Sequence, residues 1–165
     1  MHDLINDLAQ LVSGEFSTSL EDGKIYRVLE KTRHLSYLIT KYDVYKRFDP
    51  LSQIKCLRTF LPRNKYRYFS LHYLSNRVLH HLLSEMKCLR VLCLNYYWIT
   101  DLLHSIEKLK HLRYLDLSMT RIQMLSESVC NLYNLQTLML LGCHCLVELP
   151  SRMEKLINLR YLDIR

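Results

Sequence analysis

The chain has 165 residues, 49% of them hydrophobic and 24% charged, a balance typical of one globular domain rather than of a disordered segment. It holds only three glycines and three prolines, too few for an all-β sandwich with many tight turns. The formal net charge is +7, and no apolar run approaches the ~20 residues that a membrane-spanning helix needs.

The first predicted element is a helix within residues 1–14, where apolar side chains recur at the spacing of one helical face. Residues 15–30 are expected to form a connector, in which two short extended pieces flank a turn at residues 21–23. The start of the chain lacks the basic region and the uninterrupted apolar core of a secretory signal, and no Asn-x-Ser/Thr glycosylation site occurs. We therefore expect a cytoplasmic protein whose six cysteines are reduced.

Residues 31–165 are dominated by a repeat. The apolar spacing of Leu89–Leu94 returns at Leu112–Leu117, Leu135–Leu140 and Leu159–Ile164, whose starts lie 23, 23 and 24 residues apart. A leucine-based period of this length is typical of a leucine-rich repeat, whose units stack because a single unit cannot bury its own apolar side chains. The predicted fold is an α/β leucine-rich-repeat solenoid of about six units, with parallel β-strands on its concave face.

Two weaker strands are expected earlier, at Leu35–Ile39 and Leu57–Leu61, whose starts lie 22 residues apart. The next strand begins 32 residues after Leu57, which is too long for one unit, so an irregular insertion is placed at residues 62–77. Apolar residues at helical spacing from Val78 to Met86 predict a short helix after this insertion. In the later units, apolar residues in steps of three predict 3₁₀ or short α segments on the outer side.

The predicted concave face supplies the candidate partner contacts. Successive side chains of a strand point to opposite faces, so the residues that alternate with the inward leucines are expected to face a partner. They are Val91, Cys93, Asn95, Tyr114, Asp116, Ser118, Thr137, Met139, Leu141, Tyr161, Asp163 and Arg165.

Positive charge is concentrated in residues 41–90, which hold 11 Lys and Arg against 3 Asp and Glu. Basic and aromatic residues alternate over residues 63–77, a composition that suits either phosphate and base contacts or a solvated insertion. An acidic protein surface is the favoured partner and nucleic acid the less favoured one. An arginine also recurs at one repeat phase, either as a binding stripe or as the partner of acidic residues in neighbouring turns: Arg58, Arg90, Arg113 and Arg160.

The sequence shows no pattern typical of catalysis or metal binding. Cys143-His144-Cys145 lacks a second ligand pair at the spacing of a zinc site. Cys143 instead takes the repeat phase of Tyr97 and Thr120, where a side chain hydrogen-bonds the turn backbone. Neither a nucleophile elbow, a His-Glu-x-x-His motif nor a phosphate-binding Gly-rich loop is found. We therefore expect a binding protein rather than an enzyme, with no bound metal.

Four longer motifs occur in a fixed order along the chain. They are Met1-His2-Asp3-Leu4-Ile5-Asn6-Asp7-Leu8-Ala9, Lys31-Thr32-Arg33-His34-Leu35-Ser36-Tyr37, Leu109-Lys110-His111-Leu112-Arg113-Tyr114-Leu115-Asp116-Leu117-Ser118 and Leu132-Tyr133-Asn134-Leu135-Gln136-Thr137-Leu138. Together they resemble plant nucleotide-binding leucine-rich-repeat disease-resistance proteins, most of all the coiled-coil class.

The resemblance implies that residues 1–14 are the helical C-terminal remnant of a nucleotide-binding switch domain and that residues 31–165 belong to the repeat domain. In the family, the histidine of the Met-His-Asp motif lies near the phosphates of bound ADP, a role that would fall to His2. ADP or ATP is the cofactor of the full-length family. This chain carries no phosphate loop, so we expect it to bind no nucleotide by itself.

The function implied by the resemblance is that of a fragment of an immune receptor in plant defence. Its repeats would recognise a pathogen effector or a guarded host protein, and would hold the switch domain in its resting state. The alternative is a generic leucine-rich-repeat scaffold, adaptor or decoy that takes no part in a nucleotide switch.

Overall fold

The computed structural model describes residues 16–21, 24–25, 31–54, 56–63, 72–102 and 104–164. The helix expected within residues 1–14, with His2, lies outside the described residues, as does Arg165. In the described part of the chain, no helix is both long and apolar enough to cross a membrane.

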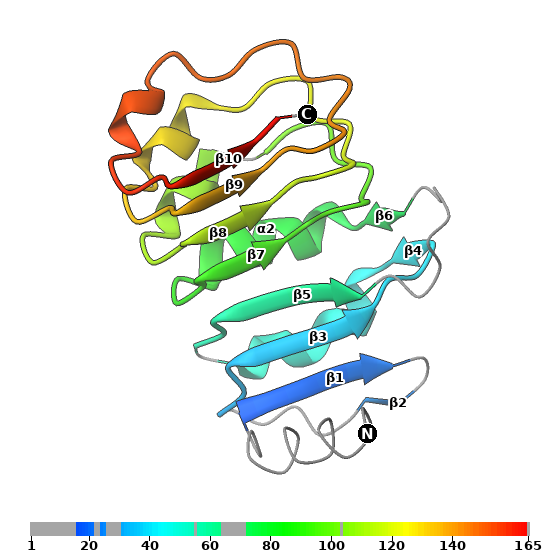
Figure 1. Cartoon of the computed structure of the whole chain (residues 1–165). Coiled ribbons are helices and arrows are strands. Elements are labelled where there is room, and N and C mark those ends of the chain that lie inside the picture. The colour runs from blue at the N-terminus through cyan, green and yellow to red at the C-terminus, as the bar shows by residue number, and fades with distance from the viewer. Residues whose placement is uncertain are drawn as a thin grey trace, which may run out of the picture.

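Strands from successive units form one sheet. They are β1 (Ser17–Glu21), β2 (Lys24–Ile25), β3 (His34–Leu38), β5 (Thr59–Arg63), β7 (Val91–Cys93), β8 (Tyr114–Asp116), β9 (Thr137–Met139) and β10 (Tyr161–Asp163). Their order across the sheet is β10-β9-β8-β7-β5-β3-β1-β2, and Figure 1 shows them stacked from β1 at the bottom to β10 at the top. β2 pairs antiparallel with β1, whereas the other neighbours are parallel. This arrangement confirms the predicted leucine-rich-repeat fold.

The inward side chains of neighbouring strands form a continuous core. In the parallel register Phe60 lies opposite Leu92, Leu92 opposite Leu115, and Leu115 opposite Leu138. All four side chains are 0% exposed. Leu162, on the edge strand β10, continues the same line but is 38% exposed. Burying one such side chain contributes roughly 1.5–3 kcal/mol, so this line holds successive units together.

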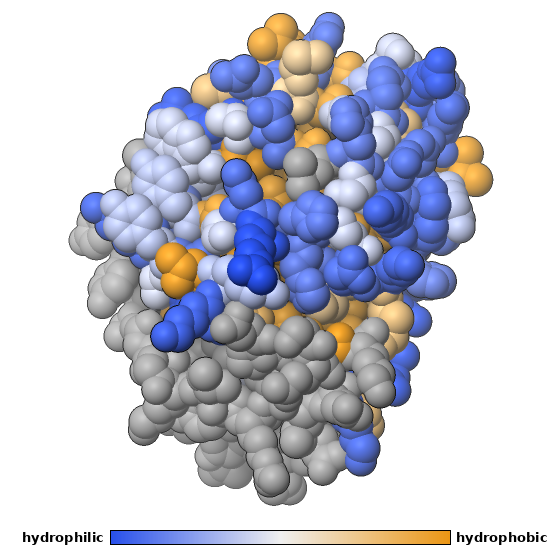
Figure 2. Space-filling view, turned by 180° about the vertical axis from the view of Figure 1, so that it is seen from behind, coloured by the Kyte–Doolittle hydropathy of each residue, from blue (hydrophilic) through white to orange (hydrophobic). Residues whose placement is uncertain are grey.

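Helical segments cover one face of the sheet and lie behind the strands in Figure 1. They are η2 (Tyr45–Gln53), α2 (Asn76–Glu85), η3 (His104–Lys108), η4 (Glu127–Asn131) and η5 (Met153–Lys155). Helix α2 confirms the helix expected after the insertion, and η3, η4 and η5 confirm the predicted 3₁₀ segments. Seen from behind in Figure 2, the surface that is not grey is mostly hydrophilic, as expected for a solvated outer side.

A second, two-stranded parallel sheet joins β4 (Tyr42–Asp43) to β6 (Tyr73–Leu74). In Figure 1 it lies to the right of the large sheet, beyond the ends of β3 and β5. The pairing continues into the next unit through a bridge between His72 and Tyr97. The segments that follow the main strands are therefore also aligned from unit to unit, which the sequence did not predict.

The register predicted for the first two repeat strands is wrong. Leu35 and Leu57 were expected at equivalent positions, but Leu35 pairs with Phe60. Since the carbonyl of Arg33 accepts the N–H of Arg58, Thr32 is the residue that corresponds to Leu57. Thr32 is only 1% exposed, so a threonine fills a leucine position and hides the repeat from an apolar pattern.

The stretch expected to be a connector, residues 15–30, also contributes to the sheet. Its two extended pieces are β1 and β2, which pair with each other. In addition, β1 pairs with β3 in parallel from Ser17–His34 to Leu20–Tyr37. The sheet therefore begins before residue 31.

One turn position has a left-handed backbone in successive units. Tyr96, Met119 and Gly142 have φ values of 64°, 58° and 69°. These residues lie 23 apart, each two positions after the last inward leucine of its strand. Only glycine adopts this conformation without steric cost, so the first two units carry local strain that the third does not.

Candidate recognition surface

The face of the large sheet away from the helical segments, here called the open face, carries two rows of side chains. The register places Val91, Tyr114, Thr137 and Tyr161 side by side in one row, and Cys93, Asp116, Met139 and Asp163 in the next. Asn95, Ser118 and Leu141 each lie two residues after the second-row residue of their own unit. The structure thus brings the described candidate contacts together, and their role in binding stays a prediction.

Access to the open face is uneven. Four candidates are largely covered by their neighbours, with exposures of 3%, 8%, 8% and 5%: Cys93, Asp116, Ser118 and Asp163. Tyr161 is 49% exposed and Leu141 37%, and the other candidates are half-buried. A partner on this face would therefore contact mainly the aromatic, apolar and threonine side chains, with the carboxylates below them.

Asp116 is held in place within the open face. Its carboxylate accepts hydrogen bonds from the Asn95 amide and from the Ser118 backbone N–H, each at 2.9 Å. Burial, with a smaller effect of Asp116, raises the pKa of the Cys93 thiol to about 12. The thiol stays protonated near neutral pH and is a poor nucleophile, which suits a recognition surface better than a catalytic site.

Arginines at one repeat phase form a column at the start of the strands, here called the arginine column: Arg33, Arg58, Arg90, Arg113 and Arg160. Each carbonyl of Arg33, Arg58 and Arg90 accepts two backbone N–H groups from the next unit, so the residues lie on neighbouring strands. The Arg33 guanidinium, followed by burial and by Arg90, lowers the pKa of Arg58.

The alternative that these arginines pair with acidic side chains is not supported. Within the described ranges, the ion pair found joins Arg47 to Asp43 and involves no member of the arginine column. Gln136 interrupts the column between Arg113 and Arg160. The column therefore offers unneutralised positive charge along one edge of the open face.

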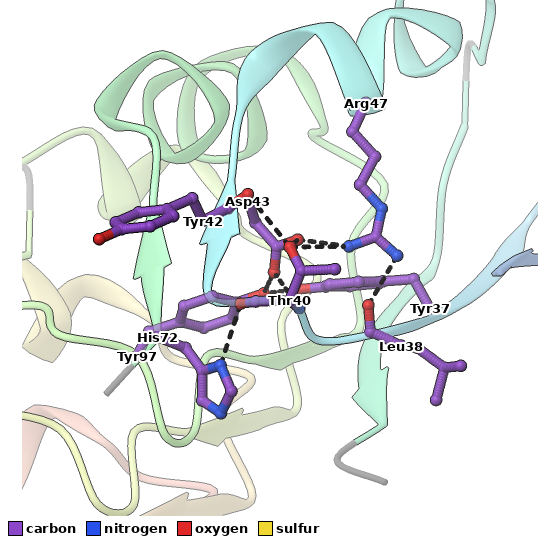
Figure 3. A network of polar contacts seen from close by, with 8 residues as sticks. All are labelled: Tyr37, Leu38, Thr40, Tyr42, Asp43, Arg47, His72 and Tyr97. Carbon is purple, nitrogen blue, oxygen red and sulfur yellow. Dashed lines mark hydrogen bonds and ion pairs between the residues drawn. The ribbon is translucent and has the colours of Figure 1, made fainter. Parts of the chain in front are cut away.

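A buried polar network fixes the second sheet to the large one, as Figure 3 shows. Asp43 lies at its centre, 1% exposed, and pairs with Arg47. The Tyr97 hydroxyl donates to Asp43, and the Tyr37 hydroxyl lies 3.0 Å from that of Tyr97. Thr40 donates to the same carboxylate at 2.7 Å.

Two further contacts extend this network to the backbone. Arg47 donates to the carbonyl of Leu38 at 2.7 Å, and His72 Nδ1 lies 2.9 Å from the carbonyl oxygen of Thr40. Burial raises the pKa values of Tyr37 and Tyr97, so both phenols remain protonated donors. The charge of Asp43 is compensated on several sides, as a buried carboxylate requires.

The Cys143 thiol confirms the packing role predicted for it. It donates to the carbonyl of Leu117 at 3.0 Å and lies 3.5 Å from the hydroxyl of Thr120, the equivalent residue of the preceding unit. In the same way Thr120 donates to Leu117 at 2.7 Å. Among the described residues, no group of three or more His, Cys, Asp or Glu side chains is placed to hold a metal ion.

The prediction of six reduced thiols is wrong for one pair. Cys56 and Cys88 form a disulfide, with their Cα atoms 5.2 Å apart, while Cys93, Cys130, Cys143 and Cys145 are free. Each cysteine of the pair immediately precedes a leucine at the same repeat phase, Leu57 or Leu89. Stacking of the units therefore places the two side chains next to each other. Alignment of the repeats in the sequence already puts the two cysteines at equivalent positions.

Sequence reasoning also missed a surface feature beside the network. The exposed rings of Tyr42, Tyr73 and Trp98 are stacked on one another, with Arg121 over Trp98. Tyr73 was noticed only as part of the basic aromatic stretch. The pairing of β4 with β6 was needed to place Tyr42 beside it, and no repeat pattern in the sequence marks that short sheet.

The sequence comparisons agree with this geometry. The family described as leucine-rich repeat region matches residues 65–165. This chain belongs to the leucine-rich-repeat family. Two Arabidopsis thaliana proteins assigned to disease resistance, the second called RPP13-like protein 1, are 46% and 47% identical over 143 and 140 residues. These matches cover 87% and 84% of this leucine-rich-repeat chain, which confirms the resemblance to plant disease-resistance proteins. They span only 10% and 13% of the relatives.

Solved leucine-rich-repeat structures share the fold. A leucine-rich-repeat protein of Leptospira interrogans superposes with a TM-score of 0.59 at 25% identity, over 82% of this chain and 32% of that one. The plant peptide hormone receptor RGFR1, solved in complex with RGF2, gives a TM-score of 0.50 at 18% identity, over 88% of this chain and 26% of the receptor.

Proposed function

We propose that this leucine-rich-repeat chain is the recognition part of a plant immune receptor and that its open face binds a protein partner. The partner is a pathogen effector or a guarded host protein, and the same face contacts the switch domain of the complete receptor. Support comes from the relatives assigned to disease resistance, at 46% and 47% identity.

The alignment of partly exposed side chains on parallel strands is the observation that carries this proposal. Tyr114, Thr137 and Tyr161 come from successive units and lie side by side, and Leu141 adds an exposed apolar group. Aromatic and apolar side chains in the centre of a patch, with arginines at its rim, are typical of protein interfaces. The unneutralised arginine column supplies that rim and favours an acidic partner.

The mechanism follows from linkage. A surface that binds the resting switch domain more tightly than the active one stabilises the resting state by the difference in binding free energy. A second protein that binds the same side chains displaces the switch domain and removes this stabilisation of the resting state. The receptor then shifts to its active state, although the leucine-rich-repeat chain itself undergoes no chemistry.

A chimeric receptor tests the proposal. The matched segment of the RPP13-like relative is replaced by this chain, and the chimera is produced in leaves without pathogen. We expect it to be quiet, and we expect cell death without pathogen when Tyr114 and Tyr161 are replaced by alanine. The matched control Tyr133→Ala, an exposed tyrosine outside the open face, should leave the chimera quiet. A quiet open-face variant would contradict the contact with the switch domain.

A further inference from the structure

An exposed stack of aromatic rings, here called the aromatic row, runs across three neighbouring segments beyond the ends of the main strands. The ring centroids of Tyr42 and Tyr73 lie 5.6 Å apart at an interplanar angle of 19°, and those of Tyr73 and Trp98 lie 6.1 Å apart at 21°. Their exposures are 60%, 39% and 39%. A contiguous exposed patch of large aromatic side chains is uncommon on a surface that serves only to meet solvent.

A cation covers each end of the aromatic row. The Lys41 ammonium lies 5.4 Å from the centroid of the Tyr42 ring, and the Arg121 guanidinium lies 5.1 Å from that of Trp98. Both basic side chains are exposed. The bridges that link Asp101 to Met124 and Met124 to Glu148 do not include the residues of the aromatic row. The aromatic row is therefore positively charged.

The buried network holds the aromatic row rigid. Each ring is directly adjacent in sequence to a network residue, Tyr42 to Asp43, Tyr73 to His72 and Trp98 to Tyr97. Backbone hydrogen bonds of 2.9 Å from Tyr73 to Lys41 and 2.8 Å from Trp98 to His72 fix the spacing. Since the rings are already ordered, little of their conformational entropy is lost when a partner binds to them.

In Figure 2, pale side chains of intermediate hydropathy gather on the left, where β4 and β6 lie in this view.

The chemistry of the aromatic row selects its partner. The rings stack on one another and a cation lies near each terminal ring, so a nucleic-acid base would have to compete with these contacts for a ring face. The ring edges remain, and these carry the positive side of the aromatic quadrupole. The phenol hydroxyls, the indole N–H, the guanidinium and the ammonium add hydrogen-bond donors.

We propose that the aromatic row is a second docking site, and that it binds an acidic polypeptide segment of a partner protein. Carboxylates and backbone carbonyls of that segment accept hydrogen bonds from the row, while its apolar side chains pack against the ring edges. The site goes beyond the proposed function, since the row lies off the open face and its occupancy does not depend on the contacts of Tyr114 and Tyr161.

The fluorescence of Trp98 tests this proposal directly, because it is the only tryptophan of the chain. The probes are three peptides of about twelve residues and an oligothymidylate of similar length. One peptide repeats Glu-Asp-Leu, the second repeats the neutral isostere Gln-Asn-Leu, and the third repeats Lys-Lys-Leu. We expect a saturable change in Trp98 emission with the acidic peptide, weakened about tenfold or more between about 50 and 500 mM NaCl.

Two variants retain Trp98 as the fluorescent residue and change the aromatic row around it. Tyr73→Ala interrupts the stack and Arg121→Glu reverses one terminal charge, and each should weaken the acidic peptide about tenfold or more. Tyr133→Ala is the matched control, since Tyr133 is an exposed ring with a lysine, Lys110, 6.0 Å from its centroid. Equal binding of the neutral and acidic peptides, tighter binding of oligothymidylate, or wild-type affinity in Arg121→Glu would overturn the proposal.

Discussion

The hydroxyl groups of Tyr37 and Tyr97 lie 3.0 Å apart in the interior, although 60 positions separate the two residues in the sequence. The Tyr97 hydroxyl in turn donates a hydrogen bond to the carboxylate of Asp43. The pair therefore connects the large sheet to the segment that carries Trp98. Stability and the order of the aromatic row depend on the same buried groups.

Removing the hydroxyl of Tyr97 should destabilise the fold. In Tyr97→Phe, Asp43 loses a donor and the Tyr37 hydroxyl loses its acceptor, and both groups remain buried. We expect the free energy of unfolding to fall by about 1–3 kcal/mol in urea titrations. Tyr133→Phe, which removes a hydroxyl at an exposed ring, should change it by less than about 0.5 kcal/mol. Equal stability of the two variants would show that the hydrogen bonds of the Tyr97 hydroxyl contribute nothing to the free energy of unfolding.

The Cys56–Cys88 disulfide should stabilise the native chain by closing a loop. The two residues are 32 apart, and a loop of this length corresponds to about 3–4 kcal/mol in the chain-entropy account. Dithiothreitol should therefore lower the urea midpoint of the wild-type chain. It should leave that of Cys56→Ser/Cys88→Ser unchanged. A wild-type midpoint that does not respond to the reductant would mean that the two thiols are not bridged in solution.

Gly142 should resist replacement by alanine for two separable reasons. Its φ of +69° is strained for an L-residue, at a cost of roughly 1–2 kcal/mol. A Cβ at this position would also lie 2.5 Å from Sδ of Met119. We expect Gly142→Ala to cost more in the wild-type background than in Met119→Ala, where only the backbone strain remains. A double-mutant cycle in urea measures the difference, and a cost near zero in both backgrounds would refute the strain.

Partial burial of His81 should make stability depend on pH. Burial, with a smaller effect of His80, lowers its pKa from the ordinary 6.5, and Glu85 opposes the shift. As the pH falls through 6.5, the unfolded chain therefore binds a proton at His81 more readily than the folded chain does. Above pH 6.5 His81 is neutral in both states and costs no stability. As the pH falls below 6.5, proton uptake by the unfolded chain lowers the free energy of unfolding. Urea midpoints at about pH 7.5 and pH 5 should differ more for the wild type than for His81→Gln.

The regular part of the fold was predictable because its signal is local and repeated. The spacing of Leu89, Leu112, Leu135 and Leu159 was enough to place β7 to β10 and the inward side chains. The earlier units were harder. Thr32 stands in a leucine position, and β1 is recognised only through its pairing with β3.

The site could be predicted only in part, for a physical reason. Alternation along a strand assigns Tyr114 and Asp116 to the open face, but it does not say that Asp116 is covered by its neighbours. The aromatic row depends on contacts between residues such as Tyr42 and Tyr73, which lie in irregular segments of unequal length. No fixed period relates them, so their stacking emerges only from the three-dimensional register.

Calorimetric titration of this chain with a purified nucleotide-binding switch domain of the plant disease-resistance family that it resembles tests recognition by the open face most directly. We expect the wild-type chain and Tyr133→Ala to bind with the same affinity, and Tyr114→Ala/Tyr161→Ala to bind at least about tenfold more weakly. Circular dichroism establishes that all three are folded. Undiminished affinity in the folded double variant would contradict the account.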